Sequence, residues 1–206
     1  MTARRCLIVT AHPLRQSLCH HLADRAEAAA RDAGMTVERL DLAQTAFDPR
    51  LTEEERASYY ADFQPTVPGD AAQLARAEML ILVFPTWWSG FPAVLKGWFD
   101  RVWAPGTAFD HSPGFGPMIP RLQRLDAVLA VTTQGGPAWI DWLVLRRPLR
   151  RILRLGILRP CAPRARLHWR ALYKAETAGA ERVADFAARV EADVAALARD
   201  TLAAAR

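Results

Sequence analysis

The chain has 206 residues, 51% of them hydrophobic, and a formal net charge of +5. This length predicts one domain over residues 1–206, with enough apolar residues for a full core. No apolar run approaches the ~20 residues of a membrane span, and the run near the N-terminus is too short for a secretion signal. The three widely spaced cysteines (Cys6, Cys19 and Cys161) form no metal-binding motif and favour a reducing, cytoplasmic location.

Apolar runs alternate with helical patterns along the chain. Apolar runs and alternations predict strands at residues 6–11, 36–42, 79–84, 127–132 and 164–173. One helix begins after the N-cap Ser17 and ends at Gly34, and others are predicted at residues 70–77, 92–103, 140–155 and 180–204. This order predicts an α/β fold, a parallel sheet between two helical layers with the doubly wound strand order 2-1-3-4-5.

Two segments between these elements are long and rich in proline. Residues 43–69 form one of them, and Thr52 with the acidic residues after it predicts a short capped helix inside it. Residues 105–120 form a second loop, rich in glycine and proline. A connection as long as the first is usually functional or locally folded.

The positive charge is concentrated in one block. Residues 142–175 contain no Asp or Glu, but they include Arg146, Arg147, Arg150, Arg151, Arg154, Arg159, Arg164, Arg166 and Arg170. Such a block is typical of a solvated helix face, or it attracts an anionic ligand. No nucleic-acid-binding motif accompanies it, so we expect no nucleic-acid partner. The first four arginines are expected on one helix face, where they would attract the phosphates of a nucleotide.

In a doubly wound sheet a ligand binds beyond the carboxyl ends of the strands. The loop after the first strand contains His12, Arg15 and Ser17 and leads into a helix N-terminus, which suits a phosphate. The alternative is an ordinary capped turn with a surface histidine. This loop lacks the glycine-rich fingerprint of dinucleotide-binding and P-loop folds.

The loops after the third and fourth strands favour a flat ring. Trp87 and Trp88 are adjacent, and both indoles cannot easily point into a core from one turn. They predict an aromatic wall for a flavin ring or, alternatively, a hydrophobic dimer patch. Gly135 and Gly136 allow a ligand to approach the backbone closely, with amides placed to stabilise negative charge.

These segments together resemble a known family. Residues 11–13 with Ser17, 47–49, 84–102, 105–109 and the turn at 132–136 are similar to the NAD(P)H:quinone oxidoreductases, which are flavodoxin-like proteins. The resemblance covers nearly the whole chain, and the stretch 84–102 is highly specific. It implies a flavodoxin-like three-layer fold, a tightly bound FAD or FMN, NAD(P)H as co-substrate and a homodimer with the flavin near the interface.

The resemblance also implies which residues bind the cofactor, although no catalytic residue or metal ligand is assigned. The flavin phosphates would be held by His12, Ser17 and Leu18, the ring by Pro85, Thr86, Trp87 and Trp88, and its pyrimidine side by Thr132, Thr133, Gly135 and Gly136. The implied activity is hydride transfer from NAD(P)H to a quinone in a ping-pong mechanism. The alternatives are a nitro- or azo-compound reductase, an ancillary regulator of a potassium-efflux transporter, and a non-catalytic electron carrier.

The chain departs from the family pattern at two places. Cys19 stands where many relatives have Asn, and residues 139–149 lack the Tyr and His that the long animal enzymes use near the acceptor. Trp139 is expected to fill part of that space. The remaining histidines are expected to be structural or at the surface: His20 and His21 on the surface of the first helix, and His111 and His168 as isolated residues.

Overall fold

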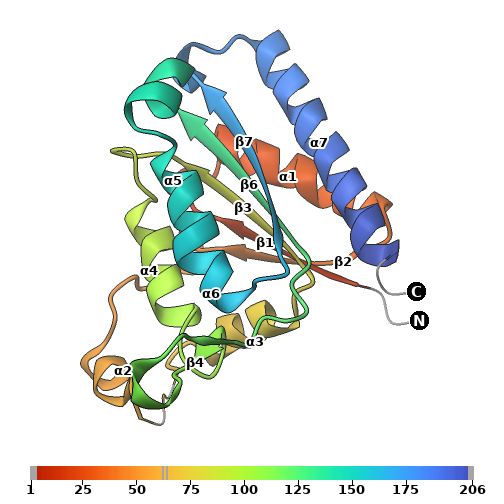
Figure 1. Ribbon diagram of the computed structural model, residues 1–206. Helices are drawn as coiled ribbons and strands as arrows, with labels where there is room; N and C mark the ends of the chain where they lie inside the picture. Colours follow the sequence, from red (N-terminus) through yellow and green to blue (C-terminus); the bar gives the residue numbers. More distant parts are fainter. Residues whose placement is uncertain (1–3, 62, 64, 204–206) are drawn as a thin grey trace.

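The computed structural model describes residues 4–61, 63 and 65–203. Its central feature is a parallel sheet in the order β2-β1-β3-β6-β7 (Figure 1), which confirms the predicted fold and the order 2-1-3-4-5. The strands are β1 (Arg5–Thr10), β2 (Thr36–Asp41), β3 (Met79–Pro85), β6 (Ala127–Gln134) and β7 (Arg166–Tyr173). The three middle strands are nearly continuous apolar runs because helices cover both faces.

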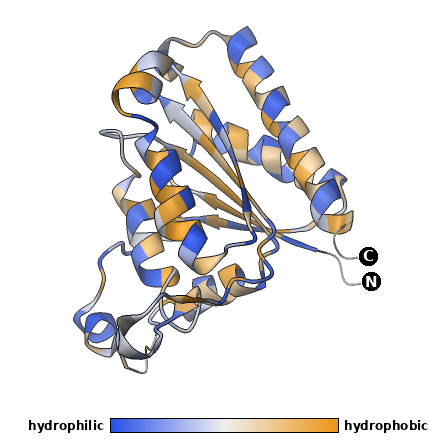
Figure 2. Ribbon diagram, viewed as in Figure 1, coloured by the Kyte–Doolittle hydropathy of each residue, from blue (hydrophilic) through white to orange (hydrophobic). Residues whose placement is uncertain are grey.

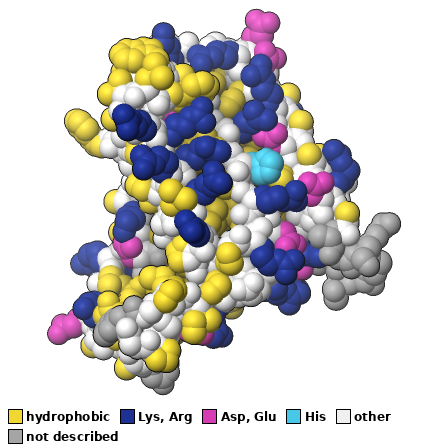
Figure 3. Space-filling model, viewed as in Figure 1, with side chains coloured by type: hydrophobic (Ala, Val, Ile, Leu, Met, Phe, Trp, Pro, Cys, Tyr) yellow, Lys and Arg dark blue, Asp and Glu magenta, His cyan; other side chains and the backbone are white. Residues whose placement is uncertain are grey.

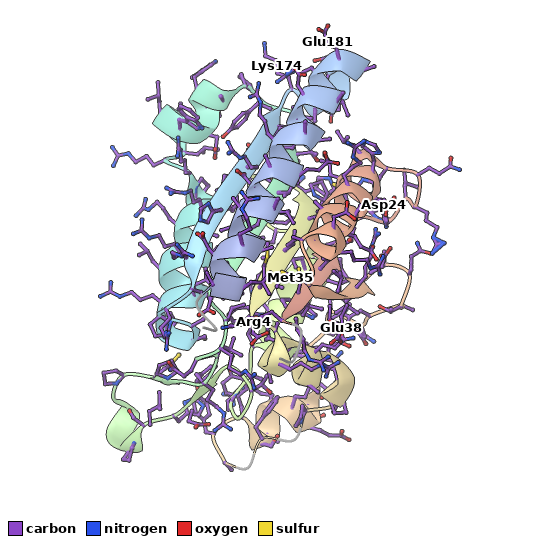
Figure 4. All side chains as sticks on the ribbon, turned by 90° about the vertical axis from the view of Figure 1, so that its right-hand side faces the viewer. Arg4, Asp24, Met35, Glu38, Lys174 and Glu181 are labelled. Carbon is purple, nitrogen blue, oxygen red and sulfur yellow. The ribbon has the colours of Figure 1, made fainter. Side chains whose placement is uncertain are left out.

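Two helical layers enclose the sheet. The helices α1 (Leu18–Asp32) and α7 (Ala180–Ala203) lie side by side on one face, as Figure 4 shows from that side. The other face is covered by α3 (Pro68–Arg76), α4 (Ala93–Val102) and the helical segment that ends in α6 (Arg159–Cys161). Alternate residues of β1 enter the two cores, Leu7 and Val9 on one side and Cys6 and Ile8 on the other. In Figure 2 the middle strands are mostly hydrophobic, whereas hydrophobic and hydrophilic residues alternate along the helices.

The long connection after β2 is locally folded, and it confirms the predicted short helix. That helix is α2 (Glu53–Ser58), and Thr52 and Glu55 form a reciprocal capping box at its start. Glu55 is fully buried and accepts a bidentate hydrogen bond from Arg101 of α4. The backbone of Pro49 also packs so closely on α4 that a Cβ on Gly97 would lie 2.2 Å from the Pro49 carbonyl oxygen. The connection is therefore fixed to the core.

The loop at residues 105–120 is also partly ordered. It contains the antiparallel pair β4 (Phe109–Asp110) and β5 (Ile119–Pro120), with the 3-10 turn η1 (Pro113–Phe115) between them. The His111 Nε2 donates to the Tyr59 carbonyl oxygen at 3.1 Å, which is a structural role as expected. Among the residues that the structure describes, no helix is long and apolar enough to cross a membrane.

The predicted continuous helix over residues 140–155 is wrong. Arg146 and Arg147 both adopt positive φ (56° and 53°), which ends one helical segment before Pro148 begins the next. The segments are η2 (Ile140–Val144), α5 (Pro148–Arg151), η3 (Ile152–Leu158) and α6. Proline fixes its own φ and disfavours the α conformation in the residue before it, so the break falls at Arg147. The four predicted arginines therefore do not share one helix face.

The other predicted elements agree with the structure within a few residues at their ends. The short turn η4 (Ala175–Thr177) precedes the last helix, α7, and the predicted helix end at Ala204 lies outside the described residues. The strand register aligns the carboxyl ends of the central strands, with Thr10 opposite Val83 and Pro85 opposite Thr133. The loops that follow β1, β3 and β6 therefore leave the sheet at the same edge.

Candidate functional site

The three loops expected to bind a ligand meet at the carboxyl edge of the sheet. Thr86 links the second loop to the third. Its backbone N–H donates to the Thr133 carbonyl oxygen at 2.8 Å, and its hydroxyl lies 2.7 Å from the hydroxyl of Thr132. The His12 ring lies 6.2 Å from the indole of Trp87, so the first loop contacts the second. Residues from three separate sequence segments thus form one continuous surface.

The first loop ends in a helix N-terminus that is suited to an anion. Ser17 is the N-cap of α1, and its Oγ accepts a hydrogen bond from the backbone N–H of His20. The first turn of α1 contains no acidic residue, so the positive end of its dipole is not neutralised locally. His12 Nδ1 lies 3.1 Å from the backbone nitrogen and 3.2 Å from the carbonyl oxygen of Leu14, so Nε2 is the ring nitrogen that faces away from this turn.

His20 is buried, so its predicted surface position is wrong, whereas His21 is exposed as expected. The His20 Nε2 lies 2.6 Å from Asp41 Oδ2, and the His20 Nδ1 lies 2.9 Å from Ser17 Oγ. Asp41 is at the end of β2, and its carboxylate holds the Nε2–H tautomer, so that Nδ1 accepts the Ser17 hydroxyl proton. No sequence pattern predicts this chain of hydrogen bonds, because Asp41 is brought to α1 by the pairing of β2 with β1.

A polar hollow of about 530 Å³ lies beside this loop. It is lined by Arg15, His20, Asp24, Arg39, Asp41 and Thr45. Arg39 forms ion pairs with Asp24 and Glu27, whereas Arg15 is exposed and has no ion pair within the described part of the chain. The donors around Ser17 therefore include one guanidinium that is available to a ligand.

The second loop turns both of its tryptophans outward. Trp88 and Ser89 have φ of 50° and 55°, and Trp87 and Gly90 exchange backbone hydrogen bonds of 3.2 and 2.8 Å across the turn. Trp88 is fully exposed and Trp87 is 47% exposed, which agrees with the expectation that the pair is not core. Left-handed backbone in non-glycine residues costs about 1–3 kcal/mol each and is concentrated at ligand sites.

Pro85 and Thr132 support the second and third loops from inside the sheet. Both are buried at the ends of their strands, while Thr133 is half-buried. Gly135 and Gly136 are exposed, and nothing lies within 4 Å of the position that a Cβ on Gly136 would occupy. At Gly135, by contrast, the Glu176 carboxylate lies 3.3 Å from that position, so the side of this turn that is open to a ligand is at Gly136.

The segment after the third loop carries a polar cluster that is not apparent from the sequence. The Tyr173 hydroxyl donates to Asp141 Oδ2 and accepts from Trp142 Nε1, both at 2.7 Å. Burial, together with the hydrogen bond to Asp141, raises the pKa of Tyr173 to about 12, so the phenol keeps its proton. The Arg147 guanidinium lies 4.2 Å from the centre of the Trp142 ring. This cluster fastens the segment to the end of β7.

The remaining predicted residues have simpler surroundings. Leu18 is half-buried at the start of α1 and packs on the core beneath it. Cys19 is buried, with its Sγ 3.8 Å from the Thr133 hydroxyl, and burial raises the pKa of its thiol to about 11. The residue that departs from the family pattern is thus an uncharged thiol that links α1 to the third loop. Trp139 is 57% exposed, and His168 is exposed on β7 as expected.

The chain belongs to the family described as having the flavodoxin-like fold, whose model matches residues 4–160. It is similar to an uncharacterised NAD(P)H oxidoreductase of Escherichia coli, with 37% identity over a segment that covers 53% of this chain and 57% of that protein. It is also similar to the rat (Rattus norvegicus) NAD(P)H dehydrogenase [quinone] 1, with 29% identity over 78% of this chain and 66% of that protein. The chain therefore matches less than two thirds of the length of each relative.

A solved structure has the same fold over its whole length. The NAD(P)H:quinone oxidoreductase from Methanothermobacter marburgensis superposes with a TM-score of 0.79 and is 22% identical, over 95% of this chain and 96% of that chain. At this level of identity the similarity establishes the fold alone.

Proposed function

We propose that this protein is a flavin-dependent NAD(P)H oxidoreductase that reduces quinones or similar acceptors. The observation that carries the proposal is the meeting of three loops with complementary chemistry at one edge of the sheet. Ser17 and the N-terminus of α1 suit a phosphate, the exposed indoles suit a flat ring, and the glycine amides suit an electron-rich edge. A flavin has these parts in one molecule, and the family and the similar relatives support this assignment.

The residues that the structure brings together fit such a group. We propose that His12, Ser17 and Leu18 hold the flavin phosphate, that Pro85, Thr86, Trp87 and Trp88 hold the ring, and that Thr132, Thr133, Gly135 and Gly136 line its pyrimidine side. The donor set supports this: it consists of hydroxyls, an imidazole and backbone N–H groups, with Arg15 near the phosphate end. Bound FMN or FAD would supply acceptance and donation of hydride.

The protein's own contribution to the reaction is binding and orientation. Trp87 and Trp88 offer a solvent-exposed aromatic surface on which a flat ring can stack, and the backbone amide of the exposed Gly136 opposes developing negative charge on a ligand. We propose that NAD(P)H and the acceptor occupy the same surface in turn, which gives ping-pong kinetics. The test is steady-state NAD(P)H oxidation with a panel of quinones, in which parallel double-reciprocal plots are expected and intersecting plots would contradict the mechanism.

We also propose that the chain forms a cytoplasmic homodimer, as a single domain over residues 1–206. The exposed indoles of Trp87, Trp88, Trp139 and Trp142 support a covered surface, whereas Phe91 packs against Phe84 and Phe99 instead of adding to it. An apolar hollow of about 470 Å³ beside α4, lined by Tyr59, Phe99 and Trp103 among others, offers further surface for a second copy. Light scattering should give twice the chain mass, and a fully active monomer would contradict the dimer.

A further inference from the structure

A basic hollow lies on the outer side of the sheet, away from the three loops. It has a volume of about 590 Å³, and five arginines contribute to its lining: Arg150, Arg154, Arg159, Arg164 and Arg166. They come from the helical segment 148–161, from the turn after it and from the edge strand β7. Figure 3 shows the resulting concentration of Lys and Arg side chains over this part of the molecule.

The hollow is separate from the proposed flavin site. Arg166 is the first residue of β7 and pairs with Ala127, the first residue of β6, whereas Tyr173 at the other end of β7 pairs with Gln134 beside the third loop. At ~3.3 Å per residue, the two ends of β7 are roughly 23 Å apart. The Arg166 end of the hollow therefore lies at the opposite end of β7 from the third loop, which contains Gly135.

Most of the positive charge in the hollow has no acidic partner. Arg166 pairs with Asp200 of α7 at 3.2 Å, but the other four arginines form no ion pair within residues 4–61, 63 and 65–203. Arg150 and Arg154 are four residues apart in helical chain, where like charges repel. The absence of Asp and Glu from residues 142–175 leaves this repulsion unrelieved locally. An external anion would relieve it.

We propose that the hollow binds a nucleotide-sized ligand that carries two or three phosphate groups. The four unpaired guanidiniums correspond to the charge of about −3 to −4 on such a ligand, and guanidinium binds phosphate through paired hydrogen bonds. Leu155, Leu158 and Leu167 give the hollow an apolar part, which accommodates the non-phosphate portion. Its volume lies in the range of small-molecule sites, about 300–1,000 Å³.

The shape favours a small ligand over a large anionic surface. A bilayer is flat, and a nucleic-acid duplex presents a long convex row of phosphates, so either would contact only the rim of a hollow. Arginines that line a hollow from three chain segments surround a compact anion instead. This assignment does not depend on the flavin proposal, since no residue of the hollow belongs to the three loops.

The experiment uses flavin-loaded protein, so that the phosphate position near Ser17 is filled, and titrates ADP and inorganic pyrophosphate by calorimetry. The double variant Arg154→Gln/Arg159→Gln is expected to bind ADP at least ten-fold more weakly than wild type. The matched control, Arg189→Gln/Arg199→Gln, removes the same charge from exposed positions on α7 and should bind ADP like wild type. Flavin content and NAD(P)H oxidation should be unchanged in both variants.

Three results would overturn the proposal. One is the absence of binding of both probes to wild type at millimolar concentration. Another is an equal loss of affinity in the control variant, which would mean that net charge alone attracts the anions. The third is co-sedimentation with phosphatidylglycerol vesicles, lost in the Arg154→Gln/Arg159→Gln variant, without any binding of ADP or pyrophosphate.

Discussion

Two irregular parts of this chain have opposite properties. In the connection between β2 and α3, the Glu55 carboxylate is buried and hydrogen-bonded by Arg101 of α4, and Thr52 closes the capping box. In the loop after β3, by contrast, Trp87 and Trp88 face solvent on a left-handed turn. Residues 47–49 of the first segment and the whole of the second belong to the motifs that resemble the family, but the exposed groups that a ligand could use are in the second.

The difference separates a structural motif from a binding motif. A buried ion pair with complete hydrogen bonding has no capacity left for a ligand, and its contribution is to fix the backbone. Exposed aromatic rings next to open amide and hydroxyl donors contribute little to folding and are available for binding. Substitutions in the connection should therefore change the free energy of unfolding, and substitutions in the Trp loop should change flavin affinity.

The largest effect is expected for Arg101→Met. This change leaves the buried Glu55 carboxylate without its partner, and breaking such a pair typically costs about 3–5 kcal/mol of unfolding free energy. Urea unfolding would measure the loss. The double variant Arg101→Met/Glu55→Leu should recover most of it, because no unpaired charge remains buried. A loss below about 1 kcal/mol in the single variant would contradict the structural role of the pair.

The same pair predicts a pH dependence. Burial alone raises the pKa of Glu55, but hydrogen bonds from Arg101, Thr52 and Thr66 outweigh it and lower the pKa to about 2 from its ordinary value of 4.5. A carboxyl with a lowered folded-state pKa stabilises the protein fully above pH 4.5, and this contribution is lost as the pH falls towards 2. The stability difference between wild type and Arg101→Met should therefore shrink over this range. A constant difference would exclude Glu55 as its source.

A loss of about 1.5–3 kcal/mol is expected for Asp41→Asn, which removes the charged acceptor of the buried His20. Because His20 in turn orients the Ser17 hydroxyl, this variant should also bind flavin more weakly. The Asp41→Asn variant is therefore expected to change both the free energy of unfolding and the flavin affinity. Asp24→Asn is the control, since its carboxylate is exposed and pairs with Arg39 only at the surface, where less than about 1 kcal/mol is expected. Chemical denaturation and flavin titration would distinguish the two variants.

A smaller effect, about 1–3 kcal/mol, is expected for Gly97→Ala. The added methyl group would overlap the Pro49 backbone, which packs directly against α4 at Gly97. Gly69→Ala, also within a helix, adds its methyl to open space and should stabilise the protein by about 0.5–1 kcal/mol. Equal melting temperatures for the two variants would show that the contact between α4 and Pro49 is unimportant.

The smallest effect on stability is expected for Trp88→Ala. Since the indole is fully exposed, unfolding should change by less than about 0.5 kcal/mol. Flavin affinity should fall by about 2- to 10-fold, which corresponds to the roughly 0.5–1.5 kcal/mol of an aromatic contact. Leu143→Ala, also at an exposed apolar position but outside the loop, should leave flavin affinity unchanged. Flavin fluorescence would detect the difference, and equal affinities would remove Trp88 from the site.

The strands and the convergence of the loops were predictable because hydrophobic periodicity and local turn residues encode them. Met79 to Phe84 is an uninterrupted apolar run, and Pro85 marks its end. The burial of His20 was not predictable, because its partner Asp41 lies on β2 and is brought close only by the fold. The helix break at Arg146 and Arg147 had one local signal in the sequence, Pro148, which lies inside an otherwise helical pattern.

The most direct test of the central claim, that the three loops form one flavin site, is a fluorescence titration of the flavin-free protein with FMN and FAD. One flavin per chain should bind to wild type and to Gly69→Ala, and Trp88→Ala should bind the same flavin with lower affinity at unchanged unfolding free energy. A folded wild-type protein that binds neither FMN nor FAD would contradict the account.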